Sequence, residues 1–164
     1  MGSSQRQYEC RNTTLRIAHM TTIYTIGFTG KSAEYFFTIL KNAGVKRIID
    51  IRLYPSTRTS GFARRKDLAF FLKSICNIGY QHNPELSPSD KTLKDYKDNK
   101  ISWADYEAEY LTLLDNKNIA ANAKPELLDS VCFLCAEKTP EQCHRRLLAE
   151  HLQTKLPNIE IKHL

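Results

Sequence analysis

Strand-like and helix-like patterns alternate along this chain, and that alternation restricts its fold more than any other feature of the sequence. Residues 21–26 (TTIYTI) form a β-branched and aromatic run that a glycine ends, as expected of a strand. Residues 32–44 carry apolar side chains at helical spacing behind Ser32, a good helix cap. Residues 45–51 (VKRIIDI) then predict a second strand. A helix between two strands is the natural connection of a parallel pair.

The same alternation continues through the middle of the chain. Residues 68–75 have apolar side chains at helical spacing, and residues 79–82 predict a short strand after them. Ser102 then predicts the start of another helix, because Asp105 stands at the reciprocal position of a capping box. The tyrosines that follow are interpreted as the buried stripe of this helix.

The last third of the chain predicts the strand at the centre of the sheet. Residues 130–136 (SVCFLCA) are a continuous apolar run of strand length, as expected where helices cover both faces of a sheet. Residues 159–164 alternate between apolar and polar side chains and predict the last strand. We therefore predict an α/β fold: a three-layer open sandwich with a largely parallel sheet, formed by residues 20–164 as a single domain. Residues 1–19 show no periodicity and are interpreted as a leader or an added arm, expected to be disordered.

Charge and composition bound the possible partners. Without residues 1–19 the chain has 21 basic and 17 acidic residues, a net charge of +4. This excess permits an anionic partner, either a small molecule or a nucleic acid, although a lysine-rich surface alone gives the same balance. We expect no membrane partner and a cytoplasmic location, because the sequence has no secretory signal and no run of about 18 apolar residues.

Polar and glycine residues follow three of the predicted strands. In open α/β sheets, ligands bind in the crevice beyond the carboxyl ends of the strands, so residues at these positions are expected to share a site. The alternatives are a simple turn at the glycine-rich segment and an ion pair between the acidic and basic residues after the second strand. The residues concerned are Gly27 and Thr29 after the first strand, Asp50, Arg52 and Arg58 after the second, and Cys135 and Glu137 after the buried run.

The segment 135–146 (CAEKTPEQCHRR) contains the largest group of side chains that could bind a ligand or take part in catalysis. Thr139 is a good helix cap and Pro140 suits a first helical turn, so we predict a helix that begins here with its amino end facing the crevice. Helical spacing then turns His144 and Arg145 to one side and Cys143 partly away. His144 and Arg145 near a positive helix end can hold an anion, and a structural histidine is the alternative.

The cysteines leave a metal site and a thiol nucleophile open. Five unevenly spaced cysteines without an export signal argue against a disulfide scaffold. Cys132 and Cys135 lie three apart on a strand and point to opposite faces, so Cys132 is assigned to the core. A metal site formed by Cys135, Cys143 and His144 is compatible with this orientation of the strand side chains. Alternatively, Cys135 or Cys143 is a nucleophile, with Glu137 as acid or base.

Three short motifs of this chain occur together in a known family. They are residues 23–27 (IYTIG), residues 49–52 (IDIR) with Pro55 and Arg58, and residues 134–137 (LCAE) leading to residues 143–145 (CHR). Together they resemble the domain-of-unknown-function 488 family. The resemblance covers nearly the whole chain from about residue 23, and it implies the α/β fold and the place of the site but no reaction. This sequence departs from the usual family form at Phe28, where a histidine is more common, and at residues 82–87, where many members have Leu-Gly-Gly.

Our leading hypothesis is an enzyme that acts on an anionic, nucleotide-like or nucleic-acid-derived substrate. The sequence identifies no cofactor. The alternatives are a non-catalytic nucleic-acid-binding module that uses the basic region around Arg64 and Arg65, and a Cys/His metal-binding protein. The predicted catalytic residues are Cys135, Glu137 and His144, and the predicted substrate-binding residues are Gly27, Thr29, Asp50, Arg52, Arg58 and Arg145.

Overall fold

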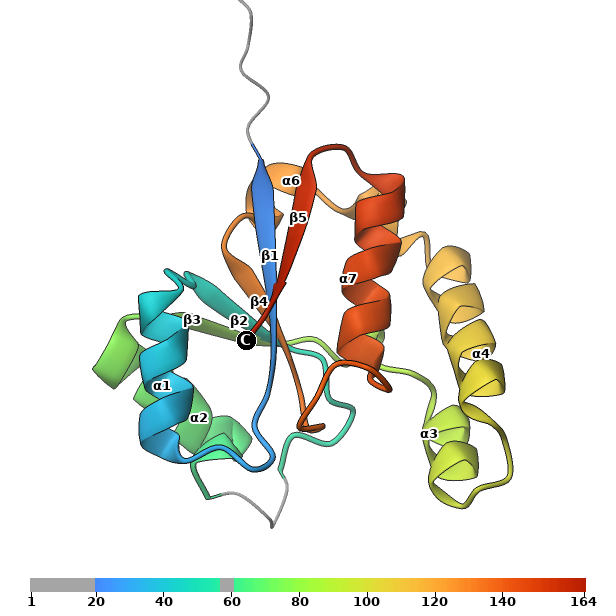
Figure 1. Ribbon diagram of the computed structural model, residues 1–164, viewed down its shortest axis with the longest axis horizontal. Coiled ribbons are helices and arrows are strands. Elements are labelled where there is room, and N and C mark those ends of the chain that lie inside the picture. The colour runs from blue at the N-terminus through green and yellow to red at the C-terminus, as the bar shows by residue number, and fades with distance from the viewer. Residues whose placement is uncertain (1–19, 57–60) are drawn as a thin grey trace, which may run out of the picture.

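The computed structural model describes residues 20–56 and 61–164 (Figure 1). The predicted leader, residues 1–19, and the predicted substrate-binding residue Arg58 lie outside the described residues.

The described chain forms one five-stranded sheet in which every pair of neighbouring strands is parallel. The strand order is β3-β2-β4-β1-β5, so the two strands from the last third of the chain lie on either side of β1. The prediction of a parallel α/β sheet is confirmed. The strands are β1 (Thr21–Gly27), β2 (Arg47–Asp50), β3 (Gly79–His82), β4 (Val131–Cys135) and β5 (Ile159–His163).

Helices cover both faces of this sheet, which gives the three layers that the sequence predicts. The first two helices pack on one face, while α3, α4 and α7 lie on the other (Figure 1). The helices are α1 (Ala33–Asn42), α2 (Arg65–Phe71), which a π-helical turn (Leu72–Cys76) continues, α3 (Asp90–Lys97), α4 (Trp103–Asn116), the short α5 (Ile119–Asn122) and α6 (Pro125–Leu128), and α7 (His144–Lys155).

Two of the three predicted helix caps, Ser32 and Ser102, are confirmed. The Ser32 side chain accepts a hydrogen bond from the backbone N–H of Tyr35 at the start of α1. At the start of α4, Ser102 and Asp105 form both hydrogen bonds of a capping box. These side chains satisfy backbone N–H groups that have no partner within the helix, which fixes where each helix begins.

Helix α3 was not predicted. Its sequence, DKTLKDYK, has only two apolar side chains, Leu93 and Tyr96, which pack together against the core. Ser89 caps it by accepting from the N–H of Thr92, and Lys91 pairs with Asp95 one turn away at 2.7 Å. Such pairs at a spacing of four residues add to the stability of a short helix.

Alternate side chains of β4 enter two separate hydrophobic clusters. Val131 and Phe133 pack with α4 and α7, whereas Cys132 and Leu134 pack with α1 and α2. Cys132 is fully buried, as its assignment to the core requires. The same alternation directs Cys135 toward α7. Within the described ranges, none of the helices is both long and apolar enough to cross a membrane.

Candidate functional site

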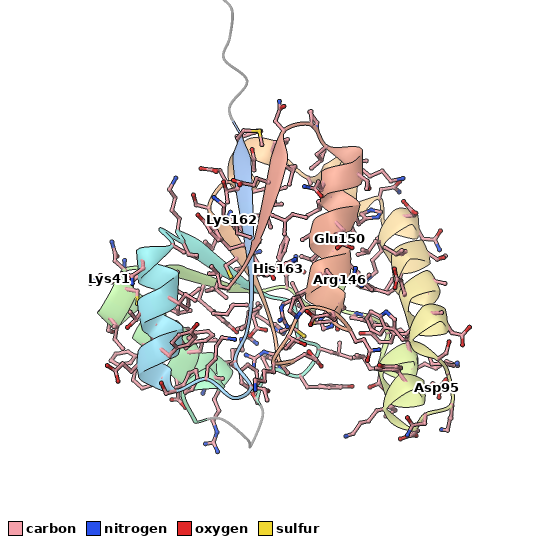
Figure 2. All side chains as sticks on the ribbon, in the orientation of Figure 1. Lys41, Asp95, Arg146, Glu150, Lys162 and His163 are labelled. Carbon is pink, nitrogen blue, oxygen red and sulfur yellow. The ribbon has the colours of Figure 1, made fainter. Side chains whose placement is uncertain are left out.

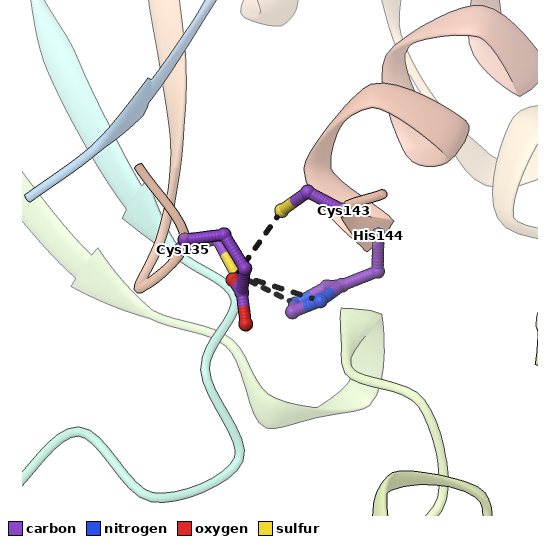
Figure 3. Close-up of side chains that lie close together, drawn as sticks. Cys135, Cys143 and His144 are labelled. Carbon is purple, nitrogen blue, oxygen red and sulfur yellow. Dashed lines mark hydrogen bonds between the residues drawn. The ribbon is translucent and has the colours of Figure 1, made fainter. Parts of the chain in front are cut away.

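Four side chains with chemically reactive groups meet at the carboxyl end of β4 (Figure 3). Cys135 is the last residue of β4, Glu137 lies in the loop that follows, and Cys143 and His144 stand at the start of α7. One sulfur, nitrogen or oxygen atom from each lies within 4.8 Å of the others. Three of the four are buried, and Glu137 is the exposed member. These four residues are called the cluster below.

The loop that carries Glu137 differs from the prediction, because α7 begins at His144 and not at Thr139. Cys143 takes the N-cap position with an extended backbone, φ −141° and ψ 134°. The reason is a tertiary contact: the Arg145 guanidinium reaches back and its Nη1 donates to the Glu137 carbonyl at 2.8 Å. That bond holds the loop folded against the sheet, and the later start of α7 turns Cys143 toward the cluster. The prediction that Cys143 points partly away is therefore wrong.

Gly27 makes this loop position possible. A Cβ atom at this residue would stand 1.6 Å from the Glu137 carbonyl oxygen and 2.9 Å from Arg145 Nη1. Neither contact is compatible with a side chain, so β1 can end here only with glycine. Gly27 therefore supports the cluster by letting the loop backbone approach closely.

The Glu137 carboxylate accepts hydrogen bonds from both thiols. Cys135 Sγ donates to Oε2 at 2.6 Å, and Cys143 Sγ donates to the same oxygen at 3.5 Å. Cys135 Sγ also lies 3.5 Å from His144 Nδ1. The carboxylate thus accepts a hydrogen bond from each of two cysteines, and the imidazole lies beside the Cys135 sulfur.

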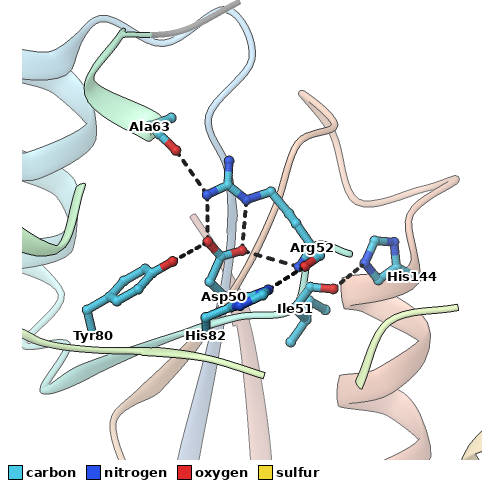
Figure 4. Close-up of polar contacts among 7 residues, drawn as sticks. All are labelled: Asp50, Ile51, Arg52, Ala63, Tyr80, His82 and His144. Carbon is cyan, nitrogen blue, oxygen red and sulfur yellow. Dashed lines mark hydrogen bonds and ion pairs between the residues drawn. The ribbon is translucent and has the colours of Figure 1, made fainter. Parts of the chain in front are cut away.

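The orientation of His144 is set by a backbone carbonyl. Its Nε2 lies 3.3 Å from the carbonyl oxygen of Ile51 (Figure 4), so this nitrogen carries the hydrogen and Nδ1 keeps a lone pair. The Tyr106 hydroxyl lies 3.5 Å from Nδ1, and the Tyr110 ring meets the imidazole edge-on. His144 therefore presents an acceptor nitrogen to the cluster.

Arg145 places a buried positive charge behind the cluster. It is 1% exposed, and Nη1 donates to Cys143 Sγ at 3.2 Å as well as to the Glu137 carbonyl. The next residue, Arg146, turns away instead and pairs with Glu150 on the outer side of α7 (Figure 2). Of these two arginines, Arg145 is the one that contacts a thiol of the cluster.

Burial and hydrogen bonding move the pKa values of the cluster in opposite directions. Burial raises the pKa of the Cys143 thiol well above its ordinary value of 9.0. The residue Glu137 is exposed as a whole, but its carboxylate turns toward the cluster, so burial acts to raise its pKa; the hydrogen bond from Cys135 outweighs this and lowers that pKa below 4.5. Glu137 is therefore ionised at neutral pH, while Cys143 keeps its proton.

Asp50 and Arg52 form a buried ion pair (Figure 4). Arg52 Nε and Nη2 donate to the two carboxylate oxygens at 2.7 and 2.6 Å, and the Tyr80 hydroxyl donates to Asp50 at 2.7 Å. Arg52 Nη2 also donates to the Ala63 carbonyl, and its guanidinium lies 5.0 Å from the centre of the Phe28 ring. This ion pair is the alternative that the sequence offered to a substrate-binding role for Asp50 and Arg52. Most of the hydrogen-bonding groups of both side chains are used within the protein.

The remaining predicted substrate-binding residue, Thr29, lies in the loop after β1. Its side chain is exposed, and its backbone N–H donates to the Ala136 carbonyl at 3.1 Å. Thr29 thus joins two loops that border the cluster, but it has no contact with the cluster side chains. All four cysteines of the described ranges are free thiols.

A pocket of about 320 Å³ opens directly above the cluster. Glu137, Cys143 and His144 line one side of it. The opposite side is aromatic: the rings of Trp103 and Tyr106 are stacked with centroids 5.0 Å apart, and Tyr96 lies 5.0 Å from Tyr106. Lys97 and Gln142 complete its polar lining.

The aromatic side of the pocket has only a weak signal in the sequence. Tyr106 was assigned to the core, and it is indeed buried while one edge borders the pocket. Tyr96 comes from the helix that was not predicted, α3. The usable signal was Trp103, the single tryptophan of the chain, placed immediately after the capping serine of α4.

Fold and site together define a parallel α/β domain with a cysteine, histidine and glutamate cluster at the carboxyl edge of its sheet. Residues 32–152 match the family model described as Domain of unknown function DUF488, and the chain belongs to this family. The matched range contains all four cluster residues. Neither a curated protein nor a solved structure matches the chain significantly.

Proposed function

We propose that this protein is an enzyme whose reaction takes place at the cluster, on an anionic substrate with a planar ring that binds in the pocket above it. The observation that carries the proposal is the hydrogen-bonded group of Cys135, Glu137 and His144 beside an aromatic pocket. Its place at the carboxyl edge of a parallel sheet is where open α/β folds bind their ligands.

Glu137 is the group best placed to exchange a proton with the substrate. It is exposed toward the pocket, and its lowered pKa keeps it ionised. Cys135 shares a proton with it at 2.6 Å, and His144 offers a second acceptor nitrogen beside the same sulfur. This arrangement supports general acid and base chemistry, in which a carboxylate accepts a proton and returns it to the leaving group.

The pocket lining supports the substrate class. Stacked aromatic side chains bind flat rings such as nucleobases through their faces. Lys97 is exposed on the same pocket and carries the positive charge that an anionic group requires. Because Arg52 already pairs with Asp50, and Arg145 bonds to the loop backbone, we assign the anion contact to Lys97.

Trp103 fluorescence tests the substrate class directly, because it is the only tryptophan of the chain. Titration with nucleoside monophosphates should change its emission to saturation, and the matching nucleosides should bind more weakly. Lys97→Gln should remove this preference for the phosphate. Lys94→Gln is the matched control, because Lys94 is exposed on the same helix and pairs with Asp90. No saturable change with any nucleotide would rule out this substrate class.

Turnover is tested by incubating the protein with the nucleotides that bind and separating the products. Glu137→Gln keeps the size of the side chain but removes its charge, so it should bind nucleotide and form no product. Equal turnover by this variant would exclude Glu137 from the chemistry. A salt-sensitive affinity for oligonucleotides that depends on Arg64 and Arg65, exposed at the start of α2, would favour the nucleic-acid-binding alternative instead.

A further inference from the structure

The donor atoms of the cluster have the spacing of metal ligands. Two of their separations are 3.5 Å: Cys135 Sγ to His144 Nδ1, and Cys143 Sγ to Glu137 Oε2. Ligands at roughly 2.0 to 2.3 Å from a tetrahedral zinc ion lie about 3.3 to 3.8 Å from one another. The shorter contact of Cys135 with Glu137 opens by a rotation of the exposed carboxylate. Little rearrangement therefore separates the cluster from a complete coordination shell.

The surroundings orient two of these donors. The hydrogen bond from His144 Nε2 to the Ile51 carbonyl leaves the Nδ1 lone pair facing Cys135. A metal-binding histidine is held in the same way, with its second nitrogen on a carbonyl or carboxylate. Arg145 Nη1 donates to Cys143 Sγ at 3.2 Å, which holds that sulfur in position beside the other donors. Both contacts come from groups outside the four donors and hold the donor side chains in position.

The charges of the cluster fit a divalent ion. Two thiolates and the Glu137 carboxylate carry three negative charges, and the imidazole is neutral. A divalent ion neutralises two of these charges, and the buried guanidinium of Arg145 offsets the third. Thiolate and imidazole donors select zinc and similar transition metals over magnesium or calcium, which prefer oxygen.

We propose that Cys135, Cys143, His144 and Glu137 bind one zinc-class divalent ion at the carboxyl end of β4. Binding replaces the two thiol protons by two metal–sulfur bonds and releases both protons to solvent. Three buried residues form a fixed set, while Glu137 faces the pocket and can be exchanged for a substrate atom or water. A metal site with one exchangeable position is typical of catalytic centres. The inference thus rests on the proposed function, since it places the ion where the substrate is expected.

Cobalt provides the probe for this site. The purified full-length protein, stripped of metal by a chelator under reducing conditions, is titrated with Co²⁺ while the thiolate-to-cobalt charge-transfer absorption is followed. We expect saturation at one ion per chain, and the absorption should disappear when Zn²⁺ is added in excess. Cys135→Ser and Cys143→Ser should lower the charge-transfer intensity. Cys76→Ser is the matched control, because Cys76 lies between α1 and the turn after α2 and should leave the spectrum unchanged.

A second measurement uses the unmodified protein, so it still tests the proposal if one of the cysteine variants fails to fold. Alkylation followed by peptide mass mapping compares the metal-free protein with the zinc-loaded protein. Zinc should slow the modification of Cys135 and Cys143 and leave the rate at Cys76 unchanged. Absence of the charge-transfer band in the folded protein, or equal alkylation rates with and without zinc, would overturn the inference.

The two proposals fail independently. Nucleotide titration of Trp103 is carried out on both the metal-free and the zinc-loaded protein. Saturable nucleotide binding without any cobalt spectrum would refute the metal site and leave the proposed function standing. A complete cobalt spectrum without nucleotide binding would support the metal site and refute the proposed substrate class.

Discussion

Replacement of Gly27 by alanine tests how the cluster is supported. The new Cβ would stand 1.6 Å from the Glu137 carbonyl oxygen and 2.8 Å from its carbon. β1 cannot move away, because Gly27 pairs with Cys135 of β4 in the centre of the sheet. The loop must move instead, and it loses the hydrogen bond from Arg145 to Glu137.

Two effects of the substitution lower the free energy of unfolding. Forcing extra atoms into a packed site costs about 1 to 3 kcal/mol. Loss of a hydrogen bond from a charged donor costs about 1.5 to 3 kcal/mol. We therefore expect the free energy of unfolding to fall by roughly 2.5 to 6 kcal/mol.

Urea denaturation followed by circular dichroism measures this change. Gly79→Ala is the control, because the atoms nearest to its Cβ would be 3.6 to 3.8 Å away, at ordinary contact distance. Its stability should stay within about 1 kcal/mol of the unmodified protein. A Gly27→Ala protein as stable as this control would refute the account of the loop given above.

Three further perturbations have expected outcomes. Asp50→Ala leaves the Arg52 charge buried without its partner, so urea denaturation should show a loss of about 3 to 5 kcal/mol, and a loss below about 1 kcal/mol would contradict the role of the pair. Ser102→Ala removes the cap of α4 and should lower the free energy of unfolding by about 1 kcal/mol in thermal denaturation, and an unchanged melting temperature would contradict the role of the cap. Burial lowers the pKa of His151 below 6.5, so the folded state binds fewer protons than the unfolded state. The free energy of unfolding should therefore have its full value above pH 6.5 and decrease as the pH falls through the pKa of the folded state. Urea titrations at successive pH values measure this decrease, which should be smaller in His151→Gln.

The sequence predicted the elements whose signals are local or periodic. β4 was recognisable from its continuous apolar run, and Ser32 and Ser102 marked helix starts by their own hydrogen bonds. The alternation of strand side chains separated Cys132 from Cys135 correctly, because a period of two is a property of the backbone.

Two features depend on side-chain contacts that no local sequence pattern indicates, and they could not be predicted. Thr139 and Pro140 have the local signals of a helix start, but the bond from Arg145 to the Glu137 carbonyl overrides them. The aromatic side of the pocket joins α3 and α4 to the start of α7, and no local pattern reports such a meeting. The predicted roles of the cluster residues stay predictions that the experiments above address.

The place of β1 between β4 and β5 determines when the sheet can close during synthesis. Residues 21–27 are synthesised before the other four strands, yet their partners are residues 131–135 and 159–163. Closure over such a long stretch of chain is slow, and an unpaired strand is prone to associate with other chains. Because Cys135, Cys143 and His144 lie in the same late segment, the thiols come together only as the sheet closes. A nascent chain short of this segment would therefore carry aggregation-prone strands and lack the cluster.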